Sequence, residues 1–173
     1  MTAGRPPQGE RTVLVVDDDD GVRESLRLII ERAGFSCQTA ANGVEALAAL
    51  RAKEAQVIIS DHDMPAMDGI ELLRLVAARY PHICRILLSA RKDAEPAMRA
   101  LNVARAYRFL TKPCRSSDLL TTLHFAFEAS DAEVEISRMA ALLRQQDNLL
   151  AHLRRRFPDV ARELDAHKPP SLV

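Results

Sequence analysis

The sequence of 173 residues lacks a net charge, a long apolar run and a signal peptide. Lysine plus arginine and aspartate plus glutamate number 24 each, so no net field attracts the chain to nucleic acid or to an anionic membrane. No apolar run approaches the roughly 20 residues that a bilayer span needs. Residues 1–10 have no apolar core and are typical of a disordered lead. We therefore expect a cytoplasmic protein without a membrane or nucleic-acid partner.

Cysteine is also scarce. The three cysteines, Cys37, Cys84 and Cys114, are odd in number and lie far apart along the chain. Their spacing matches no metal site. We expect reduced intracellular thiols that pack as small hydrophobic groups.

The sequence does contain enough apolar material for a core, with 47% hydrophobic and 28% charged residues. Five short apolar runs have the length and the β-branched or aromatic content of strands. They are Thr12–Asp17, Phe35–Ala40, Val57–Ser60, Arg85–Ser89 and Ala106–Thr111. The first, third and fourth are nearly continuous Val, Ile and Leu, which predicts strands buried on both faces.

Amphipathic segments separate these runs. Apolar residues recur at helical spacing from Val22, and Gly34 ends that helix. Further helices are predicted over 45–54, 70–76 and 94–101. This alternation predicts an α/β fold, a doubly wound parallel sheet with right-handed crossovers and helices on both faces. Functional residues of such sheets gather where the carboxyl ends of the strands open at a switch point.

Polar residues lie at the ends of four predicted strands: Asp17–Asp20 at the first, Asp61 and Asp63 at the third, Ser89 at the fourth and Lys112 at the fifth. Clustered carboxylates raise one another's pKa unless a cation joins them. Mg²⁺ takes one or two protein carboxylates and leaves the rest of its shell to water or phosphate. With a lysine and a hydroxyl added, such a site can receive a phosphoryl group, and an aspartate can be the nucleophile.

Each of these residues also has a simpler interpretation. An acidic run before a helix often only caps that helix, which is the role we expect for Asp19 and Asp20. A serine after a strand, or a lysine before a proline, is commonly a turn residue. The placement of all four groups at strand ends favours the phosphoryl site.

Four motifs resemble those of response-regulator receiver domains, the CheY-like family. They are VVDD at Val15–Asp18, DHDMPAMDG at Asp61–Gly69, SA at Ser89–Ala90 and KP at Lys112–Pro113. The resemblance covers 11–127 in order and spacing. It implies a (βα)5 flavodoxin-like fold with strand order 2-1-3-4-5. It also implies a phosphorylated signalling domain that is not a turnover enzyme.

The resemblance assigns the phosphoacceptor and the metal ligands. Asp61 would accept a phosphoryl group from the phosphohistidine of a histidine kinase or phosphotransfer protein. Asp18 and Asp61 would bind Mg²⁺ (or Mn²⁺) directly, the backbone carbonyl of Asp63 would be a third ligand, and Asp17 would act through water.

The resemblance also assigns a switch. Lys112 would pair with the phosphoryl oxygens, Ser89 would donate a hydrogen bond to one of them, and Phe109 would turn inward as that hydroxyl closes. Asp63 and Arg91 match positions on the path of the hydrolytic water. We hypothesise that this pair slows loss of the phosphoryl group, while the alternative is two solvated charges.

The region of the last strand departs from the usual family pattern. Residues 102–113, NVARAYRFLTKP, lack the common Gly-Ala, and YRFLTKP resembles a subgroup that includes hydrogenase-regulating and phosphodiesterase-linked members. Cys114 stands where the family often has an aromatic residue. Phe109 has no hydroxyl that could bind a partner.

No proline or glycine occurs between Ser117 and Phe157, which predicts one long helix. Its apolar residues follow alternating steps of four and three, a heptad pattern with Gln146 as the polar exception. They are Phe125, Ala129, Ala132, Ile136, Met139, Leu143, Leu150, Leu153 and Phe157. The pattern predicts a parallel two-stranded coiled coil over 128–157 that forms a homodimer. The alternative is a tail that folds back on its own domain.

The chain after this helix is expected to form a short helix and a disordered terminus over 158–173. Arg154–Arg156 complement the helix dipole, an interpretation that we prefer to nucleic-acid binding.

These observations predict a response regulator of a two-component phosphorelay whose C-terminal helix controls dimerisation or the docking of a downstream protein. Two alternatives remain open. One is a phosphohydrolase with Asp61 as nucleophile, although Pro65 stands where such enzymes have Thr or Val. The other is a scaffold that is never phosphorylated.

Overall fold

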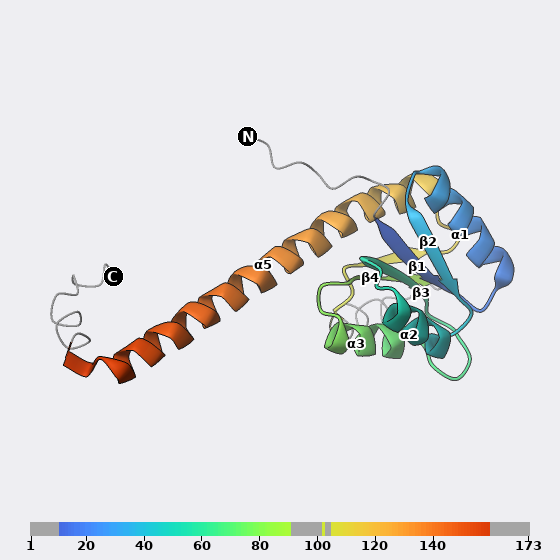
Figure 1. The fold of residues 1–173 in the computed structure, drawn as a ribbon. Helices are drawn as coiled ribbons and strands as arrows, with labels where there is room; N and C mark the ends of the chain where they lie inside the picture. The colour runs from blue at the N-terminus through green and yellow to red at the C-terminus, as the bar shows by residue number, and fades with distance from the viewer. Residues whose placement is uncertain (1–10, 91–101, 103–104, 160–173) are drawn as a thin grey trace. The chain divides into compact units, whose positions relative to one another are not determined.

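A computed structural model describes residues 11–90, 102 and 105–159 of the chain (Figure 1). Its elements are β1 (Thr12–Val16), α1 (Asp20–Arg32), β2 (Ser36–Ala40), α2 (Gly43–Ala52), β3 (Val57–Asp61), α3 (Gly69–Arg79), β4 (Cys84–Ser89), β5 (Arg108–Thr111) and α5 (Ser116–Arg156). The helix predicted over 94–101, the lead over 1–10 and most of the tail, 160–173, lie outside the described residues.

The five strands form one parallel sheet in the order β2-β1-β3-β4-β5. The predicted fold class and strand order are therefore confirmed. The register of the strands aligns the carboxyl ends of the central ones. Val16 lies opposite both Ala40 and Ser60, and Ser89 lies opposite Thr111. Residues that follow these ends therefore project from the same edge of the sheet.

Side chains that alternate along β1 supply two cores, one on each face of the sheet. Leu14 and Val16 pack with apolar residues of α2 and α3. Val13 and Val15 pack with apolar residues of α1 and of the first part of α5. Figure 1 shows α2 and α3 on the opposite side of the sheet from α1. The continuous apolar strands of the sequence follow from this double burial.

Helix α1 begins and ends where the sequence indicates. Asp19 is its N-cap and accepts a hydrogen bond from the backbone N–H of Val22 at 3.0 Å. Asp20, in the first turn, pairs with Arg23. Gly34 follows the helix with φ of 87°, a left-handed conformation that glycine adopts without steric cost. The capping role expected for Asp19 is thus confirmed.

The chain divides into two units after Glu133. In the first unit, α5 buries Leu119, Leu123, Ala126 and Phe127 against the sheet. The last turn of α5 in this unit contacts the amino ends of two strands. Asp131 accepts from Arg11 at 2.9 Å, just before β1, and the Ser130 hydroxyl donates to the carbonyl of His82 at 2.8 Å, just before β4.

In the second unit the part of α5 beyond Glu133 exposes its large apolar side chains. They are Val134, Ile136, Met139, Leu142, Leu143, Leu149, Leu150 and Leu153, followed by Phe157 after the helix end. None of the helices formed by the described residues combines the length and apolar character that crossing a bilayer requires.

Candidate functional site

Three carboxylates meet at the carboxyl edge of the sheet. Asp17 and Asp18 directly follow β1, and Asp61 is the last residue of β3. One carboxylate oxygen from each lies within 4.8 Å of the others. Asp17 and Asp61 are buried and Asp18 is exposed. The structure thus brings together the three acidic residues that the sequence placed at neighbouring strand ends.

Lys112 completes the cluster from the end of β5. Its Nζ lies 2.6 Å from Asp17 Oδ2 and 2.6 Å from Asp61 Oδ1. Its backbone N–H donates to the carbonyl of Ser89 at 2.8 Å, which continues the pairing of β4 and β5 to the site. Burial lowers the pKa of the lysine, but its hydrogen bonds to Asp17 and Asp61 and the attraction of their charges together outweigh burial, so the pKa lies above its ordinary value.

One ammonium does not offset three carboxylates. Burial raises the pKa of Asp61 above its ordinary value, and the hydrogen bond from Lys112 only partly opposes this. The charge of Asp17 adds to the rise. The ionised form of Asp61 is therefore disfavoured in this cluster, and a further cation would favour it.

Gly69 fixes the backbone that carries Asp61. A Cβ at Gly69 would overlap the carbonyl oxygen of Asp61, so a larger residue cannot occupy this position without a shift of the chain. The N–H of Gly69 donates to the carbonyl of His62 at 3.0 Å, and the N–H of His62 donates to the carbonyl of Leu88 at 2.8 Å. This close approach explains why glycine ends the DHDMPAMDG motif.

Two further contacts orient Asp17. Its Oδ1 accepts from the backbone N–H of Asp19 at 3.0 Å, while Oδ2 accepts from Lys112. Its backbone carbonyl accepts from Arg23 Nη1 at 2.5 Å. The sequence reasoning missed this role of Arg23, although its place one turn into the helix after the acidic run was a possible signal.

The remaining predicted residues lie nearby or outside the described chain. Asp63 lines the acidic pocket, and its carboxylate lies 2.8 Å from His62 Nδ1, a contact that sequence reasoning missed. Ser89 is fully buried at the end of β4, and Phe109 is half-buried against the core of α2 and α3. Arg91 lies outside the described residues.

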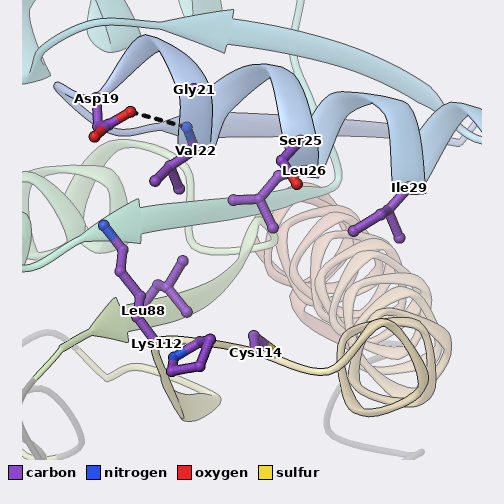
Figure 2. Close-up of a pocket in the computed structure, with 10 residues that line it drawn as sticks. Asp19, Gly21, Val22, Ser25, Leu26, Ile29, Leu88, Lys112 and Cys114 are labelled. Atoms are coloured by element: carbon purple, nitrogen blue, oxygen red, sulfur yellow. Dashed lines mark hydrogen bonds between the residues drawn. The ribbon is translucent and has the colours of Figure 1, made fainter.

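Two pockets adjoin at this edge. The acidic pocket, of about 570 Å³, is lined by the carboxylates, Val22, Ala90 and Lys112. A more apolar pocket of about 510 Å³ shares Asp19, Val22 and Lys112 with it and extends between α1 and the Pro113–Cys114 segment (Figure 2). Figure 2 shows Ser25, Leu26 and Ile29 of α1 on one side and Leu88, Lys112 and Cys114 on the other. A group held at the acidic cluster would therefore lie beside an apolar surface.

The three cysteines are reduced, as the sequence predicts. Burial raises the pKa of Cys37 and of Cys84 to about 12 each, and it also raises that of Cys114. Thiolate chemistry is therefore disfavoured at all three.

A parallel 2-1-3-4-5 sheet with carboxylates and a lysine at its carboxyl edge defines the CheY-like class of α/β proteins. The model of the response regulator receiver domain family matches residues 13–124. The chain belongs to this family.

Two curated relatives share this domain. The hydrogenase transcriptional regulatory protein HoxA of Cupriavidus necator is 33% identical over 141 residues, which cover 82% of this chain and 29% of that protein. The DNA-binding transcriptional regulator NtrC of Salmonella typhimurium is 41% identical over 101 residues, or 58% of this chain and 21% of that protein. The chain thus spans less than a third of the length of either relative.

Solved structures are similar over almost their whole length. The signal receiver domain of an HD domain-containing protein from Pseudomonas fluorescens Pf-5 has a TM-score of 0.72 and 28% identity, covering 78% of this chain and 98% of that one. The chemotaxis protein CheY4 of Vibrio cholerae has a TM-score of 0.63 and 32% identity, covering 67% and 98%. Other similar solved chains are described as response regulator receiver domain proteins, and the acidic cluster of Asp17, Asp18 and Asp61 lies within the region that the family model matches.

Proposed function

We propose that this protein is a two-component response regulator in which Asp61 accepts a phosphoryl group from a histidine kinase or a phosphotransfer protein. One observation carries the proposal. Lys112 bridges Asp17 and Asp61 at 2.6 Å each, beside the third carboxylate of Asp18. This is the charge arrangement that phosphoryl transfer needs, because such transfer depends on positioning and on neutralising phosphoryl oxygens.

The residues present fit a Mg²⁺ ion (or Mn²⁺). The donor set contains only oxygen, which suits a hard cation, and the carboxylate charge exceeds that of Lys112. Asp18 and Asp61 would bind the ion directly, with the Asp63 carbonyl as a third ligand and Asp17 acting through water. When bound, the ion supplies positive charge to the phosphoryl oxygens.

The chain's own groups carry out the transfer. An oxygen of Asp61 forms a bond to phosphorus as the bond from phosphorus to the donor histidine nitrogen breaks, and that nitrogen leaves with its electron pair. Lys112 shifts its hydrogen bond from the carboxylate to a phosphoryl oxygen. Gly69 and the His62 backbone hold the acceptor strand end while the charge moves.

The switch and the lifetime of the product involve neighbouring groups. Ser89 would donate its hydroxyl to a phosphoryl oxygen, and Phe109 would move with it from its half-buried place. Asp63 and Arg91 would slow hydrolysis. The contact of Asp63 with His62 means that this pairing competes with an existing interaction.

The donor protein would approach over the apolar pocket of Figure 2. This pocket shares Asp19, Val22 and Lys112 with the acidic pocket, so a protein packed there would hold its phosphohistidine beside Asp61. Output would pass through α5, whose exposed apolar residues suit dimerisation or the docking of a downstream protein. We propose no catalytic turnover beyond self-phosphorylation and self-dephosphorylation.

The test is incubation with acetyl phosphate and Mg²⁺, followed by intact-mass measurement. The wild type should gain the mass of one phosphoryl group, and Asp61→Asn should gain none. Asp63→Asn is a matched control, because it makes the same change two residues away and keeps the backbone carbonyl, so it should still be phosphorylated. An equal mass gain in Asp61→Asn would contradict the assignment.

A further inference from the structure

The second part of α5 carries a heptad row that the first unit does not cover. With Ile136, Leu143, Leu150 and Phe157 at the first core position of successive heptads, Met139, Gln146 and Leu153 occupy the second core position. All of these side chains are exposed, Leu143 by 61% and Ile136 by 61%. A row of this spacing is buried by another helix, and a second copy of the chain supplies an identical row.

Acidic and basic residues beside this row lie at its opposite ends. Glu133 and Glu135 flank its beginning, and Arg154 and Arg156 flank its end. These four residues occupy the positions next to the core, which set the orientation of paired helices. In a parallel pair, acidic ends would lie beside acidic ends and basic ends beside basic ends. In an antiparallel pair, each acidic end meets a basic end.

The flanking leucines give an independent indication. Leu142 and Leu149 lie beside the core row and are exposed by 54% and 58%. In an in-register parallel pair, Leu142 would face Asp147 of the other copy, and Leu149 would face Arg154. In an antiparallel pair whose two-fold axis passes between Leu143 and Gln146, Leu142 of each copy faces Leu149 of the other.

The same axis brings the charges into contact. Glu135 faces Arg156 of the other copy, and Glu133 faces Arg154, each pair occurring twice by symmetry. The core matches as well, because Met139 then packs against Leu150 of the other copy. Asp147 faces an alanine and gains no partner in this arrangement.

We propose that the second part of α5 pairs with that of a second copy in antiparallel orientation, centred between Leu143 and Gln146. This replaces the parallel orientation predicted from the heptads alone with the opposite one, and it rests on the dimerisation part of the proposed function. Opposite charges and flanking leucines both favour this orientation, whereas the core spacing by itself is compatible with either.

Cysteine crosslinking tests the orientation. In a full-length background with Cys37, Cys84 and Cys114 replaced by alanine, Met139→Cys and Leu150→Cys are made separately and mixed before mild oxidation. Antiparallel pairing should give a disulfide between the two variants and little within either one. Residues 139 and 150 are 11 positions apart, about 16 Å along a helix, so the two orientations are separable.

Charge reversal gives a second readout. Glu135→Arg should weaken dimerisation about tenfold, because two attractive pairs become repulsive. The double variant Glu135→Arg, Arg156→Glu should restore it. Arg155→Glu is the control, since it reverses a charge at an outer position of the helix and should leave dimerisation unchanged.

The outcomes separate the two proposals. Disulfides within Met139→Cys alone and within Leu150→Cys alone would establish parallel pairing and overturn the inference, while dimerisation would stand. A wild type that stays monomeric in sedimentation at high concentration would overturn both the inference and the proposed dimerisation. Phosphorylation of Asp61 would be unaffected by that result, because its mass assay does not depend on a dimer.

Discussion

The two parts of helix α5 differ in what covers their apolar side chains. In the first unit Phe127 is fully buried, its ring centroid is 5.0 Å from that of Phe35, and the Arg11 guanidinium lies 4.9 Å from the ring centroid. In the second unit Phe157 follows the helix with half of its surface exposed. The difference teaches that the first part of the helix is held by its own domain, whereas the second part would need another chain to bury its apolar side chains.

Among the described residues, the candidate site also lacks a partner, because its negative charge is only partly balanced. Its backbone is fully anchored, but its carboxylates outnumber the cation that faces them. An external cation would complete this site, just as an external helix would cover the exposed apolar residues of α5.

The largest expected difference in stability is that between alanine variants of the two phenylalanines. Phe127→Ala should lower the free energy of unfolding of the first unit by about 3–5 kcal/mol, because it leaves a cavity beside the sheet. Phe157→Ala should change that free energy by less than about 0.5 kcal/mol. Chemical denaturation followed by circular dichroism of the monomeric protein measures both. Equal losses would break the contrast between the two ends of the helix.

A smaller effect is expected from Gly69→Ala. The added methyl group meets the Asp61 carbonyl oxygen, so the chain must shift, at a cost of about 2–3 kcal/mol. Phosphorylation by acetyl phosphate should also slow, because the acceptor moves. Gly21→Ala is the control, since its Cβ would lie 3.1 Å from the Asp19 oxygen that caps α1, a side-chain atom that needs to move much less than the Asp61 backbone, so its loss of stability should be smaller. Wild-type stability in Gly69→Ala would show that the close approach does not constrain the site.

Asp61→Asn should stabilise the fold in the absence of divalent cations. The pKa of Asp61 is raised in the folded state, so its contribution favours folding at low pH and is lost as pH rises through the folded-state value. At pH 7 the ionised carboxylate therefore costs stability, and Asp61→Asn should raise the free energy of unfolding measured by chemical denaturation at that pH.

Added Mg²⁺ should raise the melting temperature of the wild type but not that of Asp61→Asn. The exposed Asp18→Asn serves as the comparison. It should lose the response to Mg²⁺ without gaining stability in its absence. If Mg²⁺ stabilises Asp61→Asn as much as the wild type, the cation binds elsewhere.

The smallest effect on stability is expected at the apolar pocket. Ser25 is exposed on α1, so Ser25→Arg should change the free energy of unfolding by less than about 0.5 kcal/mol. It should slow phosphorylation by a histidine kinase that acts on the wild type, because it fills the donor surface, and leave phosphorylation by acetyl phosphate unchanged. Val44→Arg, exposed on α2 away from the pocket, is the control. Equal slowing with both donors would contradict the docking role.

The sequence predicts the sheet well because its strands are buried on both faces. A continuous apolar run such as Val57–Ser60 is compatible with few structures other than a buried strand. The position of a strand end, in contrast, depends on pairing with the neighbouring strand. Asp61 belongs to β3 because it lies opposite Leu88 of β4, whereas β1 ends at Val16 and the next residue, Asp17, accepts a hydrogen bond from Lys112. Neither partner is visible in local sequence.

The candidate site shows the same contrast between features that the sequence predicts and features that it does not. The sequence indicates which residues meet, because strand order brings carboxyl ends together. It does not indicate that one lysine bridges two aspartates, that Arg23 holds the Asp17 backbone or that His62 contacts Asp63. Those contacts depend on side-chain geometry. For the second part of α5, the heptad spacing predicts a partner, while charge order along the helix bears on its direction.

Two hydrogen bonds tie α5 to the amino rim of the sheet. Arg11 and His82 hold Asp131 and Ser130 at the amino rim of the sheet, whereas Asp61 stands at the opposite, carboxyl rim. A five-residue strand separates these rims by roughly 16 Å. Helix α5 begins at Ser116, four residues after Lys112 of the acidic cluster, so this one helix runs from the carboxyl rim to the amino rim. A change at Asp61 that moved Lys112 would therefore act on the start of the same helix whose later turn is held at the opposite rim.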